Sequence, residues 1–412
     1  MDLKDLAVNG GPKAVQKLPD RFHFGKEEKA AVTALIDKLS ERGSCPGYNG
    51  PEEKAFCSEF ADFLGGGYAD GTNSGTNSVF VALRSLHLPP FSEVVTGCIT
   101  DAGGAMPVVL NDCIPIPADT APGSFMPGPE EIEARITERT SAILVAHIFG
   151  DPADMPGIMK VAEKHHLPVV EDCAQAHMAR IHGKNVGTFG EVGSFSLMFG
   201  KHFCAGGQGG AVFTKSEERY KEVQRSADRG KPFGAPAGST NLFPALNCSM
   251  DEIHATIARV QLKKLPDIVR RRQEAVKWLW THGLEKLPEI SCPQLTMPEG
   301  FESCYWRMRL EFHPEAMKCS MMEYIAALAA EGVIAMDYHF AVPFHQEWYK
   351  NRRNSFPWNT PQYSRFDRDY ALPNMQKTLD SQFIVFILES YGPAELQLIM
   401  DAFFKLHEAF AK

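Results

Sequence analysis

The chain has 412 residues, of which 44% are apolar and 23% are charged, and its formal net charge at neutral pH is −9. This composition is typical of globular proteins with a sizeable core, and it excludes disordered and collagen-like chains. The acidic balance and the lack of a basic run argue against a nucleic-acid surface, so we expect no nucleic-acid partner.

Nothing in the chain predicts a membrane span or a secretion signal. Residues 383–388 are typical of the longest purely apolar stretches, at about six residues against the roughly 18 that a spanning helix needs. Residues 1–5 lack the apolar core of a signal peptide. We therefore expect a soluble, cytoplasmic protein with no membrane partner.

The ten cysteines are scattered along the chain, and no two of them have the C-x-x-C spacing. Zinc sites usually pair their ligands at short spacing, and disulfide frameworks belong to small secreted domains. We therefore expect reduced thiols and no metal site.

The first two-thirds of the chain alternates short apolar runs with helical patterns. The candidate strands are Glu93–Cys98, Ser141–Ile148, Leu167–Asp172, Gly193–Leu197 and Gly210–Thr214. The candidate helices are Glu52–Leu64, Asn77–Leu86, Pro129–Ile136 and Met155–His166. This alternation predicts an α/β fold with a mostly parallel sheet between layers of helices. Ligands of such sheets bind beyond the carboxyl ends of the strands, so residues that follow strands are the first candidates for a site.

The order of elements changes after residue 250. A long helical pattern runs from Met250 to about His282. It is followed by candidate strands and helices at Tyr305–Phe312, Ser320–Glu331, Val333–Tyr338, Gln382–Leu388 and Pro393–Ala411. We therefore predict a large α/β domain over residues 1–250, and a linking helix with a smaller α+β domain over residues 251–412.

Residues 169–177 read Val-Val-Glu-Asp-Cys-Ala-Gln-Ala-His. The apolar residues place Asp172 at the carboxyl end of a buried strand, where a carboxylate is costly to bury and needs a cationic partner. Aspartate is also a common helix N-cap, and this stretch alone does not decide between the two roles.

A lysine follows the next predicted strand. Lys201 stands among apolar residues and glycines and precedes the glycine-rich run 205–210. Burial would lower the pKa of its amine and favour the neutral form that a Schiff-base lysine needs. Taken alone, the segment also fits a flexible loop with a surface lysine.

A third segment, residues 73–78, reads Asn-Ser-Gly-Thr-Asn-Ser and precedes an amphipathic helix. The free N–H groups of a helix N-terminus can bind phosphate, although an ordinary helix cap would look the same. Together the three segments offer a phosphate site, a buried acid and a buried amine. That combination suits pyridoxal 5′-phosphate (PLP) as the cofactor.

Five motifs in this order make the chain resemble the DegT/StrS family of PLP-dependent aminotransferases, which form amino sugars and aminocyclitols. The motifs are Gly50-Pro51 before a phenylalanine-bearing helix, and residues 73–76, 147–155, 171–177 and 187–201. The resemblance extends from residue 9 to near the C-terminus. It is nearest to the inosose and aminohydroxybenzoate branches of the family.

The resemblance implies a fold type I architecture with a seven-stranded type of sheet, the cofactor PLP, and a homodimer with shared active sites. Lys201 would form the internal aldimine and move protons between cofactor and substrate. Asp172 would keep the pyridine nitrogen protonated. These two residues are the implied catalytic groups.

The remaining implied contacts to the cofactor come from five residues. Gln175 would hydrogen-bond the phenolic oxygen, and Gly75, Thr76 and Ser196 would hold the phosphate. Asn247 resembles the asparagine that reaches the phosphate in the active site of the partner subunit.

The chain departs from the family pattern in several places. Cys248-Ser249 stands where the family usually has Tyr-Arg, so an arginine is missing. Asp101 lies where many members place an aromatic residue against the cofactor, and Gln208 lies where an acid is common. His202 follows the lysine, whereas a dehydratase branch of the family replaces the lysine itself with histidine.

The predicted function is the transfer of an amino group from glutamate or glutamine to a keto sugar or keto-cyclitol, through pyridoxamine phosphate. Two alternatives stay open: PLP-dependent dehydration or aromatisation of a keto sugar, and a non-catalytic regulatory protein of the same fold. The presence of Lys201 favours transamination. Loops that determine specificity are expected at Phe22–Tyr48, Gly230–Leu246 and Pro343–Tyr363.

Overall fold

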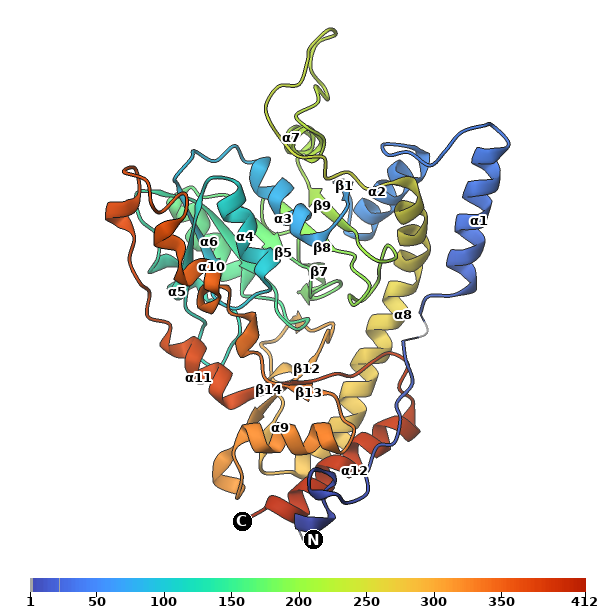
Figure 1. Cartoon of the computed structure of the whole chain (residues 1–412), viewed down its shortest axis with the longest axis vertical. Helices are drawn as coiled ribbons and strands as arrows, with labels where there is room; N and C mark the ends of the chain where they lie inside the picture. Colours follow the sequence, from blue (N-terminus) through green and yellow to red (C-terminus); the bar gives the residue numbers. More distant parts are fainter. Residues whose placement is uncertain (1–2, 22) are drawn as a thin grey trace.

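The computed structural model describes residues 3–21 and 23–412 (Figure 1). Its centre is a seven-stranded sheet with the strand order β1-β9-β8-β5-β4-β2-β3. The strands are β1 (Tyr68–Thr72), β2 (Glu93–Gly97), β3 (Ile114–Ala118), β4 (Thr140–Ala146), β5 (Val169–Asp172), β8 (Val192–Ser196) and β9 (Gly210–Thr214). Only β9 runs against its neighbours, since it pairs antiparallel with both β1 and β8. The predicted α/β class and mostly parallel sheet are confirmed.

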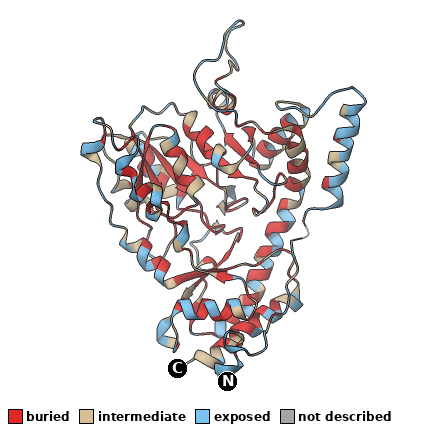
Figure 2. Cartoon of the chain, in the orientation of Figure 1, coloured by how far each residue is buried: buried red, intermediate tan, exposed pale blue. Residues whose placement is uncertain are grey.

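Helices cover both faces of this sheet, which is why β2, β5 and β8 are buried along their whole length and β4 is buried after its first two residues. One face packs against α3 (Gly75–Arg84), and the other packs against α2 (Pro51–Phe63) and α6 (Met155–His165). The sheet alternates its side chains accordingly: Val170 faces the α3 layer, whereas Val169 faces the α6 layer. Figure 2 shows the buried residues concentrated in this sandwich.

The predicted strands and helices of this region lie within a few residues of the observed ones, but several elements were not predicted. Residues 26–40, expected to be part of a loop from Phe22 to Tyr48, form the helix α1 (Lys26–Ser40), and Phe22 lies outside the described residues. This helix buries only Glu28 and Leu35, so it lacks the apolar stripe that reveals a helix in sequence. Other elements that were not predicted include β1, β3, α4 (Ala102–Leu110) and α7 (Glu217–Ala227) in this region, and α11 (Pro373–Ser381) nearer the C-terminus.

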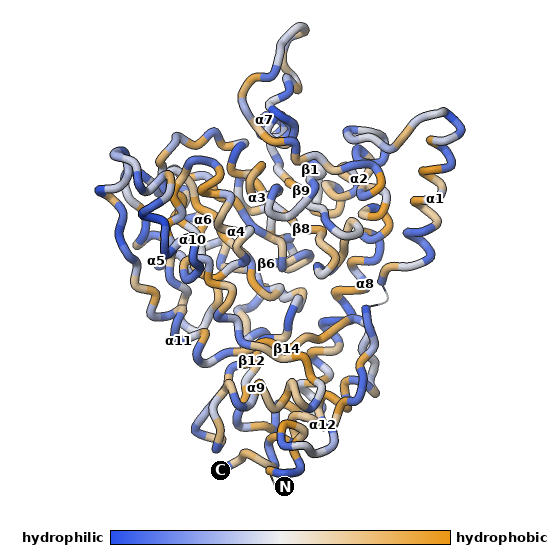
Figure 3. Tube along the Cα trace, viewed as in Figure 1, coloured by the Kyte–Doolittle hydropathy of each residue, from blue (hydrophilic) through white to orange (hydrophobic). Residues whose placement is uncertain are grey.

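The C-terminal region follows α8 (Glu252–His282) and contains a four-stranded antiparallel sheet, in the order β10-β12-β14-β13. Helices α9 (Met321–Ala330) and α12 (Pro393–Phe410) pack on it around Tyr324 and Phe403. Figure 3 shows apolar residues gathered where this sheet meets its helices. The strands are β10 (Ile290–Ser291), β12 (Met308–Phe312), β13 (Ala335–Met336) and β14 (Gln382–Val385).

Five further elements are short. Strands β6 (Arg180–Ile181), β7 (Lys184–Asn185) and β11 (Phe301–Glu302) form a small sheet, and the other two are the helices α5 (Pro129–Glu133) and α10 (Glu347–Lys350). Among the described residues, no helix has both the length and the apolar character needed to cross a membrane.

The division into two domains at residue 250 stays a prediction, because apolar packing crosses it in both directions. Leu6 and Val15 lie in the apolar cluster of the C-terminal sheet. Conversely, Tyr338 and Trp358 lie in a cluster of the central sheet. The two parts of the chain therefore share core residues.

A buried ion cluster centred on Glu389 also joins these parts. The Glu389 carboxylate accepts hydrogen bonds from Arg21 Nε at 2.7 Å and from Arg272 Nε at 2.9 Å. Arg21 in turn donates to the backbone carbonyls of Lys201 at 2.7 Å and His202 at 3.0 Å. Burial alone would raise the pKa of Glu389, but Arg272 and Arg21 outweigh it and lower this pKa to about 2.

Replacing Arg272 tests how much this cluster stabilises the fold. Arg272→Met leaves Glu389 with a single arginine inside the protein, and removing one partner of a buried ion pair costs about 3–5 kcal/mol. Urea unfolding should show a loss of this size, whereas Arg271→Met, exposed on the same helix, should cost less than about 1 kcal/mol. Equal effects of the two substitutions would contradict a stabilising role for the cluster.

Candidate active site

A cavity of about 150 Å³ lies where the carboxyl ends of β5 and β8 meet the N-termini of α3 and α4. Five of the seven predicted cofactor-binding residues line it: Gly75, Thr76, Asp172, Ser196 and Lys201. They come from three separate segments of the chain, as expected for residues that follow the strands of a parallel sheet. Asp101 and Gln208 also line this cavity.

Lys201 is buried without a carboxylate close enough to form an ion pair among the described residues. Its Nζ lies 4.3 Å from the centroid of the Trp306 ring. Burial lowers the pKa of Lys201 to about 8, although Asp172 and Asp101 oppose this shift. A substantial fraction of the amine is therefore neutral near physiological pH, as a Schiff-base lysine requires.

Asp172 ends strand β5 and is buried. Its Oδ1 accepts the backbone N–H of Ala174 at 3.0 Å, and its Oδ2 faces Gly104, where a Cβ would lie only 3.0 Å away. Burial raises the pKa of Asp172, while the Ala174 N–H and Lys201 partly counteract the rise. The carboxylate thus lacks an ionic partner and fits the protonated pyridine nitrogen of PLP.

The N-terminus of α3 supplies the site for an anion. Ser74 caps the helix by accepting the N–H of Asn77 at 3.2 Å, so the predicted cap is present, and the N–H groups of the first turn remain available. A Cβ on Gly75 would come within 2.5 Å of the Ser196 Cβ, so only glycine allows this close approach. These N–H groups and the Ser196 hydroxyl fit the phosphate of PLP.

Gln175 and Asn247 do not line the cavity. The Gln175 carbonyl oxygen accepts the N–H of Phe149 at 3.0 Å, and its amide donates to the Tyr338 hydroxyl at 3.1 Å, which leaves one amide hydrogen unused. Asn247 is exposed on the surface of this chain. The proposed role of each residue toward the cofactor stays a prediction.

Two of the departures from the family pattern can now be located. Asp101 caps α4, since its Oδ1 accepts the N–H of Gly103 at 2.9 Å, so a helix terminus stands where an aromatic residue was expected in the family. His202 points away from the cavity and donates to the carbonyl of Cys304 at 3.1 Å. Burial keeps the pKa of His202 well below its usual value, so it is neutral.

Sequence analysis missed Trp306 and Arg307, which precede β12. Arg307 is buried, and its guanidinium lies 4.1 Å from the centroid of Trp306 and 3.7 Å from that of Phe386. It donates to the Trp306 carbonyl at 2.7 Å, and no carboxylate among the described residues pairs with it. Burial lowers the pKa of Arg307 to about 9. The only signal in the sequence was an arginine between apolar residues within the predicted strand Tyr305–Phe312.

Glu171 beside Asp172 organises the end of β5. Its carboxylate accepts the backbone N–H groups of Gly187, Phe189 and Gly190 at 2.7–2.8 Å and contacts His147 Nε2 at 3.2 Å. His147, Glu171 and Cys173 are close enough together to bind a metal ion. Because the carboxylate already accepts these hydrogen bonds, we assign the group a structural role.

A family model described as the DegT/DnrJ/EryC1/StrS aminotransferase family matches residues 26–383. The chain belongs to this family. It is thus an aminotransferase, and PLP is its cofactor. The predicted family and the predicted cofactor are confirmed. The cavity residues fit that cofactor, as described above.

Two curated relatives are similar over most of their length. The chain is 32% identical to UDP-N-acetyl-3-dehydro-alpha-D-glucosamine 3-aminotransferase of Acidithiobacillus ferrooxidans, over 81% of this chain and 86% of the relative. It is 33% identical to L-glutamine:2-deoxy-scyllo-inosose aminotransferase of Micromonospora echinospora, over 74% and 75% of the two chains.

Solved structures support the fold. The aminotransferase from Psychrobacter cryohalolentis superposes with a TM-score of 0.83 at 24% identity, over 95% of this chain and all (100%) of the other. A Bacillus subtilis protein with bound cofactor PMP gives a TM-score of 0.81 at 22% identity, over 96% and 86% of the chains. The fold type I architecture is confirmed.

The lowered pKa of Lys201 predicts how the aminotransferase takes up its cofactor. Only the neutral amine attacks the PLP aldehyde, so the rate of covalent PLP capture by the cofactor-free protein should rise with pH, with a midpoint near the pKa of about 8. Stopped-flow absorbance measures this rate.

A substitution of Asp172 tests whether the nearby charge sets the pH midpoint of PLP capture by Lys201. Because the Asp172 charge favours the protonated amine, Asp172→Asn should move the midpoint to lower pH. Asp62→Asn, an exposed residue of α2, should leave it unchanged. A wild-type midpoint near the ordinary lysine value of about 10.4 would contradict the burial of the amine.

Proposed function

We propose that this aminotransferase moves the amino group of glutamine or glutamate to a keto sugar or keto-cyclitol. One observation carries the proposal: a buried arginine without a carboxylate partner, Arg307, lies beside the buried amine of Lys201. An unneutralised buried cation is costly unless a ligand completes its pairing. An amino acid supplies both the missing carboxylate and the amino group to be transferred.

The geometry around Trp306 suits an amino acid. The Lys201 Nζ and the Arg307 guanidinium lie 4.3 and 4.1 Å from the centroid of the same indole ring. A guanidinium binds a carboxylate through two parallel N–H···O bonds, which fixes the orientation of the ligand. Arg307 would hold the donor carboxylate while the donor nitrogen points toward Lys201.

PLP, when bound, supplies an electron sink that acidifies the carbon carrying the amino group. The neutral Lys201 amine would accept the proton from this carbon and later donate it again, which its lowered pKa allows. The Asp172 carboxylate would keep the ring nitrogen protonated. Arg307 is buried and Trp306 is half-buried against the Lys201 amine, so these two side chains would limit the access of water to Nζ from their side.

Support for the acceptor comes from the relatives and from the polar rim of the cavity. The two relatives named above act on a nucleotide-linked keto sugar and on an inosose, and one of the names specifies L-glutamine as donor. Asp101 and Gln208 offer a carboxylate and an amide to a hydroxyl-rich acceptor. These groups favour a sugar or cyclitol over an apolar ketone.

We further propose a cytoplasmic homodimer with shared active sites. The segment 229–246 projects from the body of the molecule beyond α7 (Figure 1), and it exposes Leu242 and Leu246. Asn247 lies at the base of this segment, exposed and next to Asn73 at the start of α3. A second subunit would cover the apolar residues and receive Asn247 at its phosphate site.

Absorbance of the PLP-loaded protein tests the proposed function. Addition of glutamine or glutamate should convert the cofactor to its pyridoxamine form, and the effective donor is identified by comparing the two. Lys201→Ala should lose the conversion. A protein that binds PLP but responds to neither donor would favour dehydration, aromatisation or a non-catalytic role instead.

Arg307→Met tests the donor site. Hydrogen bonds to charged groups contribute about 1.5–3 kcal/mol, so glutamine should bind about 10- to 100-fold more weakly in the first half-reaction. Arg307→Lys should restore part of the affinity, and Arg271→Met should not change it. An unaltered dissociation constant for glutamine in Arg307→Met would place the donor carboxylate elsewhere.

A further inference from the structure

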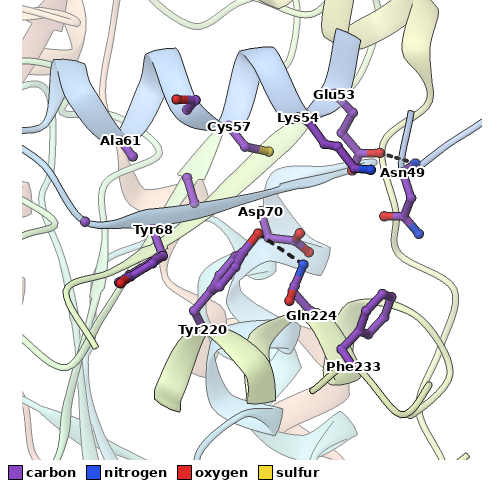
Figure 4. Close-up of a pocket in the computed structure, with 13 residues that line it drawn as sticks. Asn49, Glu53, Lys54, Cys57, Ala61, Tyr68, Asp70, Tyr220, Gln224 and Phe233 are labelled. Atoms are coloured by element: carbon purple, nitrogen blue, oxygen red, sulfur yellow. Dashed lines mark hydrogen bonds between the residues drawn. The ribbon is translucent and has the colours of Figure 1, made fainter. Parts of the chain in front are cut away.

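A second cavity, of about 440 Å³, lies between α2, β1 and α7 (Figure 4). It shares no lining residue with the active-site cavity. Its walls combine the aromatic side chains of Tyr68, Tyr220 and Phe233 with the carboxylates of Glu53 and Asp70. The volume lies within the range of small-molecule sites.

Asp70 is the decisive residue of this cavity. Its side chain is 8% exposed and points into the cavity from the middle of β1 (Figure 4). No hydrogen-bond donor and no cation among the described residues pairs with its carboxylate. Burial, followed by the nearby charge of Asp228, raises the pKa of Asp70 to about 7.

Glu53 adds a second acid from the facing helix α2. It is 3% exposed, and its carboxylate accepts the backbone N–H of Asn49 but pairs with no lysine or arginine among the described residues. Burial and Asp70 raise the pKa of Glu53 to about 8. Two carboxylates therefore face one cavity, and no lysine or arginine in the described part of the chain forms an ion pair with either of them.

The other charged and titratable groups around the two acids do not neutralise them. They are Lys54, Cys57, Tyr68, Tyr220, Asp228 and Glu252. Lys54 is exposed, and Asp228 is already paired with Arg229 and Lys231. Burial raises the pKa of the Cys57 thiol well above its usual value, so the thiol stays neutral.

We propose that this cavity binds a small organic amine in its ammonium form, with Asp70 and Glu53 as its anionic partners. The ammonium ion would supply the missing counter-charge, and the aromatic walls would contact its carbon chain and its charge. A metal ion fits less well, because these two acids belong to no group of three or more potential ligands at metal-binding distances; among the described residues only His147, Glu171 and Cys173 form such a group. The inference does not depend on the proposed donor or acceptor.

Calorimetric titration of the PLP-loaded protein with 1,4-diaminobutane tests the proposal, with 1,4-butanediol as the uncharged match. The diamine should bind once per chain and the diol should not. Because the cation binds the ionised acids, its affinity should rise at least about tenfold from pH 6 to pH 8.5 as these groups lose their protons. Cofactor absorbance, recorded in the same samples, should stay constant.

Asp70→Asn should weaken diamine binding at least tenfold, whereas Asp62→Asn, exposed on α2, should not. Asp70→Asn removes an uncompensated buried charge, so this substitution should not lower the melting temperature of the protein. If Asp70→Asn nevertheless fails to fold, Glu53→Gln provides a second variant for the binding measurement. Three results would each overturn the proposal: equal binding of the diol, unchanged affinity in Asp70→Asn, or a titration that follows a change in cofactor absorbance. Loss of subunit association in Asp70→Asn, without diamine binding by the wild type, would assign the acids to a subunit interface instead.

Discussion

The site depends on keeping the amine of Lys201 buried without a salt bridge. A carboxylate at ion-pair distance would hold the amine in its charged form, and water would do the same. The fold instead places the indole of Trp306 against Nζ and keeps Asp172 nearby but unpaired. Lys201 is thereby poised to react, and Asp172 remains free to serve a different cation.

This arrangement leaves one negative and one positive side chain near Lys201 without an ionic partner in the described part of the chain, namely Asp172 and Arg307. Among the described residues, no cation pairs with Asp172 in the cavity, and no carboxylate pairs with Arg307, which lies against the same indole ring as Lys201. Buried charges without partners reduce stability, so their presence marks groups that a ligand completes. A cofactor with a basic ring nitrogen and a substrate with a carboxylate would each neutralise one of them. The cavity between α2 and β1 has a similar character, because among the described residues no lysine or arginine pairs with either of its two acids.

The sequence predicted the parts of this arrangement that depend on local patterns. The branched apolar residues before Asp172 predict a buried strand, and the polar turn before the α3 helix predicts a capped N-terminus; both are present. Strand β1 was missed because Asp70 and Gly71 are typical of turns, and its strand form depends on pairing with β9. Helix α1 was missed because its surface is largely exposed.

Arg307 was missed for a different reason, namely its distance along the chain from the other residues of the site. It lies more than a hundred positions after Lys201 in the chain, and no local pattern indicates that the two side chains share one indole ring. Its position is set by tertiary packing of the segment before β12 on the central domain, which periodicity does not encode.

The Glu389 cluster also bears on how this protein can change over evolutionary time. Its carboxylate belongs to the segment after β14, whereas its two arginines belong to the N-terminal segment and to α8, and one of them also binds the carbonyl of Lys201. A recombinant gene that joins the N-terminal half of one relative to the C-terminal half of another must inherit compatible partners at all three places. Exchange of whole halves between relatives is therefore constrained. Sequence change is less constrained in the loops at the rim of the active site.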